Sequence, residues 1–480
     1  MSSQLLRVSR RGSRAQTLRG ITVLPAVDFA TMFACFMIGG VVNFSYENLT
    51  DQRLAILLVL TAAAVSVFKY LGHYDRRRLF WQEVGDIVVV AGIGFLLDAA
   101  LLYLLKVNFS RLWVLTSWTL IVFSVPIARR AVKSVMLRHG TWREPTVVIG
   151  TGPIAREAAE AYAHDRYLGY EIIAFLDPAA RADDEDGIEF EGRKIPVLPM
   201  NGAERDTLSR FGSPHVVVAL DAEEVADNEN LIERLCLATR SLDVISPLRG
   251  LPINNTRLAH FFSREVLALR IHNNLARPWA RYLKRLFDLA AASAILVLVA
   301  PLMAVIALLL RLEGGPVLFA HQRVGREGRL FPCYKFRSMV PNAKEVLDRL
   351  LAEDPEARAE WERDHKLKND PRITRLGHFL RKLSLDELPQ LFNVLRGDMS
   401  LVGPRPVVPE ELERYGDAKV YYLMVRPGLT GLWQISGRND IDYDQRVALD
   451  TWYVRNWTLW NDIVILFKTL VVVPSRAGAY

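Results

Sequence analysis

Four long apolar runs dominate the first quarter of the chain, near residues 23–43, 54–72, 86–105 and 111–128. Each run is long enough to form a helix that crosses a hydrocarbon layer about 30 Å thick. We therefore predict a membrane protein with an α-helical bundle of four spans over residues 23–130.

Charged residues between the runs predict their orientation. The segment 1–22 is basic, the second loop carries Arg76-Arg77-Arg78, and the first loop holds Glu47 and Asp51 against one arginine. Arginine and lysine are again frequent after the fourth run. Loops rich in these residues stay on the cytoplasmic side of a membrane. The basic tail, the second loop and everything after the fourth run are therefore predicted to be cytoplasmic.

Two carboxylates lie within these runs. Asp28 is near the start of the first run, where placement at the membrane interface is expected, and Asp98 is deep in the third. An ionisable side chain at that depth normally faces the interior of a bundle and has a polar partner. The sequence predicts such a partner for Asp98 without naming it.

A water-soluble stretch follows, at about residues 143–265. A buried-strand pattern over 146–150 leads into a glycine turn and a helical pattern, and a second strand ends at an acidic residue. This order predicts a Rossmann-like α/β domain with an open parallel sheet, and the turn matches the dinucleotide-binding fingerprint. Because such a turn also serves tight strand–helix packing, nucleotide binding and packing both remain open. The residues concerned are Gly150, Gly152, Ala155 and Asp177.

A fifth apolar run, Leu289 to Leu310, has basic residues on both flanks and Pro301 near its middle. Both flanks favour the cytoplasmic side, and proline bends a helix because it breaks the hydrogen-bond ladder. We predict a re-entrant helix over about 284–311 that enters one leaflet, turns at Pro301 and leaves on the same side. The alternative is a fifth span with a proline kink, which would place the rest of the chain outside the cell.

Asp386 and Glu387 stand side by side in a segment rich in arginine and lysine. One interpretation is a capping box at a helix start, formed by Ser384 and Glu387. Against it, Pro389 would fall in the second turn of that helix and remove a backbone hydrogen bond. The other interpretation is phosphoryl transfer, because arginine binds phosphate oxygens and a carboxylate can hold Mg²⁺ or attack phosphorus.

Patterns around this pair predict further elements. The loop 323–329 indicates a hairpin, residues 341–366 a charged amphipathic helix, and residues 375–383 a basic helix. Aromatic residues precede a last apolar stretch, 463–473, which is short for a span and is predicted to be a surface-lying or buried helix. We interpret these aromatic residues as interfacial; they are Trp452, Tyr453, Trp457 and Trp460.

Composition narrows the picture further. The 480 residues indicate several domains. The net charge of +7 indicates an anionic partner such as nucleic acid, anionic lipid or a phosphorylated substrate. Three scattered cysteines are too few for a disulfide framework or a zinc site.

Several motifs in the C-terminal part carry a family resemblance. They are Lys284-Arg285-x-x-Asp288 before the proline-bent helix, Tyr334 to Met339, Ser384 to Gln390, Ser400 to Pro406 and Arg426 to Gly431. Over residues 275–480 the chain resembles the bacterial sugar transferases, the monotopic phosphoglycosyl transferase superfamily. The preceding spans and Rossmann-like domain are similar to those of its large members, the undecaprenyl-phosphate hexose-1-phosphate transferases. One departure is Ala300 before Pro301, where many small members have serine.

The resemblance implies an α-rich catalytic domain, Mg²⁺ as cofactor and a defined reaction. A UDP-sugar and undecaprenyl phosphate give undecaprenyl diphosphate sugar and UMP, the first membrane step of exopolysaccharide or O-antigen synthesis. UDP-glucose is the first expectation for the donor and UDP-galactose the second. The resemblance further implies a multi-pass protein of the bacterial inner membrane with its catalytic domain on the cytoplasmic face. It is compatible with a homodimer, and it points to lipid rather than nucleic acid.

The resemblance also assigns roles to residues. Asp386 would attack the sugar-proximal phosphate, and Glu387 would assist by holding the metal or taking the acceptor's proton. Both carboxylates would hold the metal. Further roles fall to Arg381 and Arg405 as phosphate contacts, to Lys335 and Arg337 as weaker ones, and to Lys284, Arg285 and Asp288, with Pro301, as residues that fix the re-entrant helix at the headgroup level.

Two other classes of protein remain as alternatives. Membrane-anchored nucleotide-sugar dehydratases and epimerases can share the spans and the Rossmann-like domain, but they need a Tyr-x-x-x-Lys pair. The one spelling we single out, Tyr415 to Lys419, lies far beyond the glycine turn, with a membrane segment between, so we treat it as chance. A non-catalytic scaffold for polysaccharide assembly would fit the N-terminal half alone, but the Asp386–Glu387 pair does not favour it.

Overall fold

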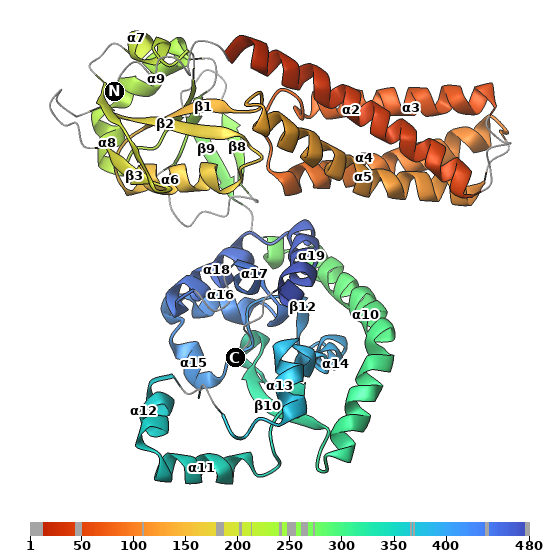
Figure 1. Ribbon diagram of the computed structural model, residues 1–480, viewed down its shortest axis with the longest axis vertical. Coiled ribbons are helices and arrows are strands. Elements are labelled where there is room, and N and C mark those ends of the chain that lie inside the picture. Colours follow the sequence, from red (N-terminus) through yellow and green to blue (C-terminus); the bar gives the residue numbers. More distant parts are fainter. Residues whose placement is uncertain are drawn as a thin grey trace. The chain divides into compact units, whose positions relative to one another are not determined.

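The chain forms two compact units in the computed structural model, Met1–Arg249 and Gly250–Tyr480. Each is described by itself (Figure 1). The structure describes residues 13–43, 50–107, 110–178, 187–200, 204–212, 214–239, 242–246, 256–260, 267–271, 274–364, 367, 370–436 and 441–475. Residues 1–12 of the predicted basic tail lie outside this part of the chain.

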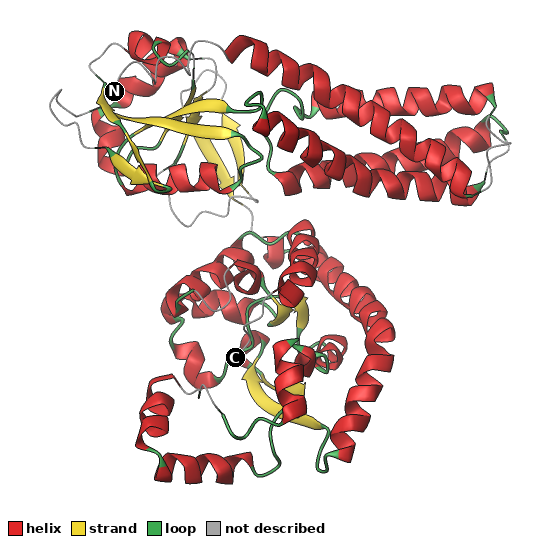
Figure 2. Ribbon diagram, in the orientation of Figure 1, coloured by secondary structure: helices red, strands yellow, loops and turns green. Residues whose placement is uncertain are grey.

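The first unit begins with a bundle of long helices that follow the four apolar runs (Figure 2). They are α2 (Ser13–Val42), α3 (Asp51–Tyr70), α4 (Phe80–Leu104) and α5 (Arg111–Arg138). Each of the four is long and apolar enough to cross a membrane. Helix α2 starts earlier than the run at 23–43 and so includes part of the predicted tail.

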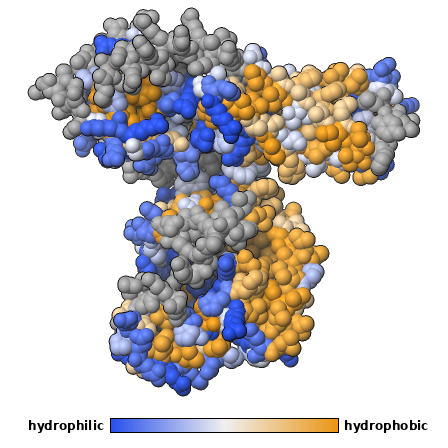
Figure 3. All heavy atoms as spheres, viewed as in Figure 1, coloured by the Kyte–Doolittle hydropathy of each residue, from blue (hydrophilic) through white to orange (hydrophobic). Residues whose placement is uncertain are grey.

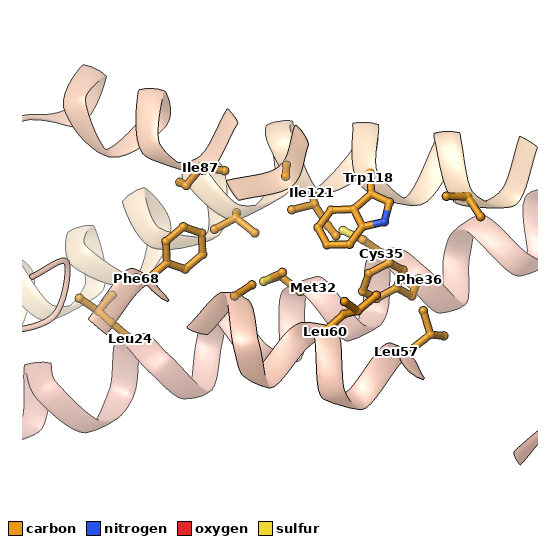
Figure 4. Close-up of a cluster of buried hydrophobic side chains, with 14 of the residues drawn as sticks. Leu24, Met32, Cys35, Phe36, Leu57, Leu60, Phe68, Ile87, Trp118 and Ile121 are labelled. Atoms are coloured by element: carbon orange, nitrogen blue, oxygen red, sulfur yellow. The ribbon is translucent and has the colours of Figure 1, made fainter. Parts of the chain in front are cut away.

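The bundle has an apolar core and an apolar outer surface, the latter visible in Figure 3. Inside, Phe36, Phe68 and Trp118 come from three different helices and pack in one cluster (Figure 4). Phe36 and Trp118 meet edge to face, with ring centroids 5.2 Å apart. Large side chains such as Leu96 and Ile127 remain exposed on the outside. A surface of this kind is suited to lipid.

Buried ion pairs hold the helices together; those of the described residues include Arg53–Asp98, Arg129–Asp28 and Lys133–Glu83. Asp98 is fully buried and accepts hydrogen bonds from Arg53 and from Trp118 Nε1, the latter at 3.1 Å. This confirms the predicted polar partner and names it as Arg53. Asp28 is also fully buried in protein, where it accepts hydrogen bonds from Arg129 Nη2 at 2.6 Å and Tyr74 Oη at 2.7 Å.

The rest of the first unit is an α/β domain, as predicted. Its sheet is parallel, in the order β5-β2-β1-β6-β7. Helix α6 packs on one face, and α7 and α9 pack on the other. The elements are β1 (Glu144–Ile149), α6 (Pro153–His164), β2 (Tyr170–Asp177), β3 (Ile188–Phe190), β4 (Arg193–Ile195), β5 (Val197–Pro199), α7 (Glu204–Ser209), β6 (His215–Val218), α8 (Ala222–Asp227), α9 (Glu229–Ala238) and β7 (Leu242–Val244).

The basic loop between α3 and α4 ties this domain to the bundle. Arg77 donates hydrogen bonds to Glu144 and, at 2.8 Å, to the carbonyl oxygen of Trp142. Its guanidinium also lies 4.7 Å from the centre of the Trp142 ring. Arg77 belongs to the loop whose positive charge predicts a cytoplasmic position. In the structure it also attaches the α/β domain to the bundle.

The second unit is α-rich and contains short sheets. The predicted hairpin is present, and the predicted helix over 341–366 is two helices because Pro355 starts a second one. The elements are β8 (Thr256–His260), β9 (Leu267–Ile271), η3 (Asn274–Ala276), α10 (Pro278–Leu312), β10 (Leu318–Val324), η4 (Arg326–Gly328), β11 (Leu330–Phe336), α11 (Ala343–Glu353), α12 (Pro355–Asp364), α13 (Arg375–Lys382), η5 (Leu385–Glu387), α14 (Gln390–Arg396), β12 (Ser400–Val402), α15 (Pro409–Glu413), η6 (Gly416–Ala418), α16 (Lys419–Met424), β13 (Gly428–Thr430), α17 (Leu432–Ser436), α18 (Tyr443–Arg455) and α19 (Leu459–Ser475).

Helix α10 runs through Pro301 and follows a curved path along one side of this unit (Figure 1). It is the fifth helix, among those described, that is long and apolar enough to cross a membrane. Ala292 in its first half packs with residues of β11, α14 and α18. Met303, Ile306 and Leu310 in its second half pack with residues of β11 and α13.

The charged residues at the start of α10 bind protein groups. Lys284 Nζ lies 2.7 Å from Asp462 and donates to the carbonyl oxygen of Val402 at 3.0 Å. Asp288 accepts hydrogen bonds from Ser400 Oγ at 2.8 Å and from the backbone N–H of Leu401 at 3.1 Å.

Arg285, the third of these charged residues, donates to the last carbonyl oxygens of α14, those of Val394 and Leu395, at 2.6 and 2.8 Å. Cations at a helix C-terminus also complement the helix dipole. In the structure, Lys284, Arg285 and Asp288 therefore attach α10 to the body of the unit. Their level in a membrane stays a prediction.

Two of the aromatic residues predicted to be interfacial belong to this core. Tyr453 and Trp457 are buried, and both donate hydrogen bonds to Asp462, at 2.7 and 3.0 Å. The interfacial interpretation is therefore wrong for these two. The physical reason is that the buried Asp462 carboxylate needs donors, which the sequence pattern alone does not reveal.

The pair Lys284–Asp462 gives a first prediction. Replacing Lys284 by methionine would leave the buried Asp462 carboxylate without its cation, which should lower the free energy of unfolding by about 3–5 kcal/mol. Lys419→Met is the matched control, because it breaks an exposed pair with Glu413 and should cost less than about 1 kcal/mol. Denaturant unfolding of the purified variants measures both. Equal losses in the two variants would contradict the importance of the buried pair.

Candidate active site

The two carboxylates lie on a short turn whose apolar residues join a core cluster. Leu385 and Leu388 pack against the cluster formed by residues of α10, β11 and α13, among them Ile306, Phe336 and Leu380. Asp386 and Glu387 stand between these leucines in the η5 turn. The apolar contacts therefore fix the backbone on which the carboxylates are placed.

Ser384 reverses the chain just before this turn. Its φ of 56° and ψ of 23° lie in the left-handed region, and its side chain caps no helix. The capping-box interpretation is therefore wrong. Helix α14 begins only after Pro389, so the proline precedes the helix and breaks no hydrogen bond within it.

Asp386 is 7% exposed and lies close to Glu387 and Lys335. Lys335 Nζ, on β11, is 2.7 Å from Glu387 Oε1 and 4.0 Å from Asp386 Oδ2. Burial raises the pKa of Asp386 to about 6, and Glu387 adds to this, while Lys335 and Arg381 oppose it. At neutral pH the group is therefore an ionised carboxylate with little hydration, a state suited to a nucleophile.

Further cations share one face of the β10–β11 hairpin with Lys335. Cross-strand pairing places Arg323 opposite Phe331 and His321 opposite Cys333, and alternate residues of a strand point to the same side. Burial raises the pKa of Cys333 to about 11; Glu387 adds to this, and Lys335, Arg323 and Arg405 oppose it. All four charged groups therefore lie within electrostatic reach of this thiol.

Arg323 and Arg405 lie close enough to repel each other. Burial, with the charge of Arg405, lowers the pKa of Arg323. Glu411 is 3.9 Å from Arg323, and the Arg405 guanidinium stacks 5.2 Å from the centre of the Trp433 ring. Two neighbouring guanidinium groups with one carboxylate form a setting that favours an anion such as phosphate. Sequence analysis did not assign Arg323 to the site. The signal that could have found it is the hairpin register, which places Arg323 opposite Phe331 and so on the same face as Lys335.

Arg381 and Arg337 have different positions. Arg381 Nε donates to Ser338 Oγ at 2.8 Å, and its charge acts on Asp386. Arg337 is buried at the end of α10, where its Nη2 donates to the carbonyl oxygen of Leu310 at 3.2 Å. The described contacts of Arg337 are therefore with the end of α10, whereas Arg381 lies close enough to Asp386 to stabilise its charge.

A metal would have to be shared with substrate at this site. Among the residues that the structure describes, no group of three or more His, Cys, Asp and Glu side chains is placed to hold an ion. Mg²⁺ commonly binds through one or two carboxylates together with substrate phosphates and water. Asp386 and Glu387 fit that mode, provided that Glu387 exchanges its contact with Lys335 for the ion.

The glycine turn of the α/β domain is explained by packing. A Cβ on Gly150 would lie 2.3 Å from the carbonyl oxygen of Ala219, and a Cβ on Gly152 would lie 2.2 Å from Asp221 Oδ2. Ala155 is fully buried, and Asp177 Oδ2 lies 3.4 Å from Thr151 Oγ1. The Asp221 carboxylate stands beside the turn where a pyrophosphate would approach, and like charges repel. Nucleotide binding here stays a prediction that this geometry does not favour.

Comparison with known proteins assigns the C-terminal part of the chain to a family. Residues 279–476 match the family model described as bacterial sugar transferase. The "Undecaprenyl-phosphate galactose phosphotransferase" of Salmonella typhimurium is 47% identical over 95% of this chain and 94% of its own length. The chain belongs to the bacterial sugar transferase family.

Other bacterial sugar transferases match the chain over different lengths. The "Exopolysaccharide production protein ExoY" of Rhizobium meliloti is 54% identical over 42% of this chain and 91% of its own length. The "UDP-glucose:undecaprenyl-phosphate glucose-1-phosphate transferase" of Klebsiella pneumoniae is 27% identical over the full length of both.

The tyrosine and lysine of the Tyr-x-x-x-Lys motif each bind a different side chain in this structure. Tyr415 is buried and donates to Asp450 Oδ2 at 2.9 Å, while Lys419 Nζ lies 2.6 Å from Glu413. The two side chains therefore do not form a catalytic pair, in agreement with its interpretation as chance.

The environment of Asp386 gives a pH prediction. We expect its ionised form to act as the nucleophile, so the rate of phosphosugar transfer should rise as pH increases through about 6 and then level off. Lys335→Met removes a cation that stabilises the carboxylate, so the acidic limb should move to higher pH. Lys335→Arg keeps the charge and should leave the limb nearer its original position. A pH–rate profile of the three proteins measures this, and a limb that stays in place in Lys335→Met would refute the electrostatic role.

Proposed function

We propose that the protein transfers hexose-1-phosphate from a UDP-sugar to undecaprenyl phosphate, with release of UMP. The observation that carries the proposal is the buried Asp386, with Glu387, beside Lys335 and Arg381, on a turn packed against an apolar cluster to which α10 contributes. Kinship with a galactose phosphotransferase of this type over 95% of the chain supports it.

Asp386 acts as the nucleophile in two displacements. One of its oxygens attacks the phosphorus next to the sugar, the bond from that phosphorus to the bridging oxygen of UMP breaks, and UMP leaves with the electron pair. The phosphosugar is then held as an acyl phosphate on Asp386. A phosphate oxygen of the lipid attacks the same phosphorus, and the Asp386 carboxylate is released.

The cations lower the repulsion between an anionic nucleophile and an anionic diphosphate. Lys335 is within reach of both carboxylates, and Arg323, Arg381 and Arg405 supply further positive charge for the phosphate oxygens. Mg²⁺, when bound by Asp386 and Glu387, would neutralise additional charge on the diphosphate. Glu387 would hold the metal or, as the alternative, take the acceptor's proton.

Galactose-1-phosphate is our proposal for the donated group. Over nearly the whole chain, a relative named for galactose is 47% identical and a relative named for glucose is 27% identical. A second relative named for glucose is 42% identical over 40% of the chain. This reverses the order expected from the resemblance alone, in which UDP-glucose came first.

We further propose four spans in the bacterial inner membrane and a re-entrant α10, with the catalytic site on the cytoplasmic face. The support is that both ends of α10 pack on one compact unit. Near its start, Lys284 binds Asp462, and near its end Leu310 packs with Phe336 and Leu380. A straight span would separate these ends by a hydrocarbon layer of about 30 Å.

The reaction is tested by UMP release from a panel of UDP-sugars with undecaprenyl phosphate and Mg²⁺. We expect release with UDP-galactose above UDP-glucose, and exchange of labelled UMP into the UDP-sugar without acceptor. Asp386→Asn should abolish both, because an amide is a poor nucleophile. Asp417→Asn, at an exposed position, is the control. Activity that survives in Asp386→Asn would mean that another residue is the nucleophile.

The topology of α10 is tested with single cysteines at Arg277 and Glu313, which flank the helix. In a variant with Cys236 replaced by serine, a membrane-impermeant maleimide should label both positions in inverted vesicles and neither in intact spheroplasts. Labelling of the two positions from opposite sides would establish a fifth span instead.

A further inference from the structure

An open recess of about 440 Å³ lies between the end of α10 and the start of α13. It is lined by Leu309, Leu312, Glu313, Arg375 and Leu376. Three of these five side chains are leucines, so the recess is mainly apolar. Because the recess is wide open, it offers an apolar surface along which a hydrophobic chain can lie, rather than an enclosed pocket.

Apolar residues continue from this recess along α13 towards the carboxylates. Phe379 is 55% exposed and Leu383 is 38% exposed, and residues spaced by three or four positions share one face of a helix. Leu376, Phe379 and Leu383 therefore form a stripe about 10 Å long along the helix axis. Ser384 and the η5 turn with Asp386 follow at once.

The other end of the stripe meets the exposed face of α10. Leu302, Val305, Leu309 and Leu312 recur at spacings of three and four residues and are all exposed. Figure 3 shows apolar surface over this helix. An apolar track therefore connects a helix suited to lipid with the turn that carries the nucleophile.

Resting on the proposed function, we propose that this track binds the isoprenoid chain of the acceptor. The acceptor's phosphate must reach Asp386 while its chain remains in an apolar environment, and the stripe joins those two places. Its first isoprene units lie along Leu383 and Phe379, and the chain leaves through the recess beside Leu309 and Leu312. The UDP-sugar is polar and makes no use of the track.

The test separates the two half-reactions in lipid nanodiscs. The variants are Phe379→Gln and Leu383→Gln, with Phe379→Leu as a conservative variant. Val420→Gln is the matched control, because Val420 is 63% exposed on α16. Each protein is assayed for exchange of labelled UMP into the UDP-sugar without acceptor. Transfer is then measured to undecaprenyl phosphate and to methyl phosphate.

We expect UMP exchange and transfer to methyl phosphate to match wild type in all variants. In the two glutamine variants, KM for undecaprenyl phosphate should rise about tenfold, the effect of losing part of one buried apolar side chain. Phe379→Leu should recover most of the loss, and Val420→Gln should show none.

The contrary outcomes are distinct. An unchanged KM for undecaprenyl phosphate, with normal exchange, would overturn the track while the proposed function stands. An equal loss with methyl phosphate would mean that Phe379 and Leu383 shape the phosphate site, or hold ordinary membrane lipid, and would also overturn it. Absence of exchange in the wild-type protein would refute the proposed function and, with it, the track.

Discussion

The position of the Asp386–Glu387 pair depends on an apolar contact. Leu385 and Leu388, on either side of the two carboxylates, pack against an apolar cluster that joins the second half of α10 to β11 and α13. The first half of α10 is held by Lys284, whose ammonium group is buried against Asp462. A buried ion pair therefore holds one end of α10, and an apolar cluster holds the other end. Together these contacts place the acidic pair near a helix whose exposed surface is apolar. The chemistry we propose needs this arrangement, because one substrate is polar and the other is largely hydrocarbon.

Local patterns predicted the elements of the fold well. Runs of apolar residues indicated the bundle helices, and the strand, glycine turn and helix around Gly150 indicated the parallel sheet. Within the candidate site, Asp386, Glu387, Lys335 and Arg405 came from motifs, and the structure places all four around Cys333 or in contact with each other. These features are short-range, so the sequence carries them in consecutive or regularly spaced letters.

Features that depend on distant pairs escaped prediction. The partner of Asp98 is Arg53, on another helix, and the partner of Lys284 is Asp462, near the other end of the catalytic unit. Tyr453 and Trp457 resemble interfacial residues in the sequence, but they serve as donors to the buried Asp462. Arg323 enters the site through the register of a hairpin. Single-sequence patterns do not encode which distant residues meet, and this explains both the partners left unnamed and the wrong interpretation of Tyr453 and Trp457.

Two of the buried ion pairs of the bundle bear on how the protein enters a membrane. An arginine or aspartate without a partner is costly within an inserting helix. Arg53 on α3 and Asp98 on α4 belong to consecutive helices, so a hairpin of the two enters with its charges already neutralised. Asp28 on α2 also accepts from Tyr74, but its cationic partner is Arg129 on α5, which follows only when the last of the four helices is made. Of the four spans that we propose, α2 is therefore synthesised first, but its buried carboxylate gains its cation last.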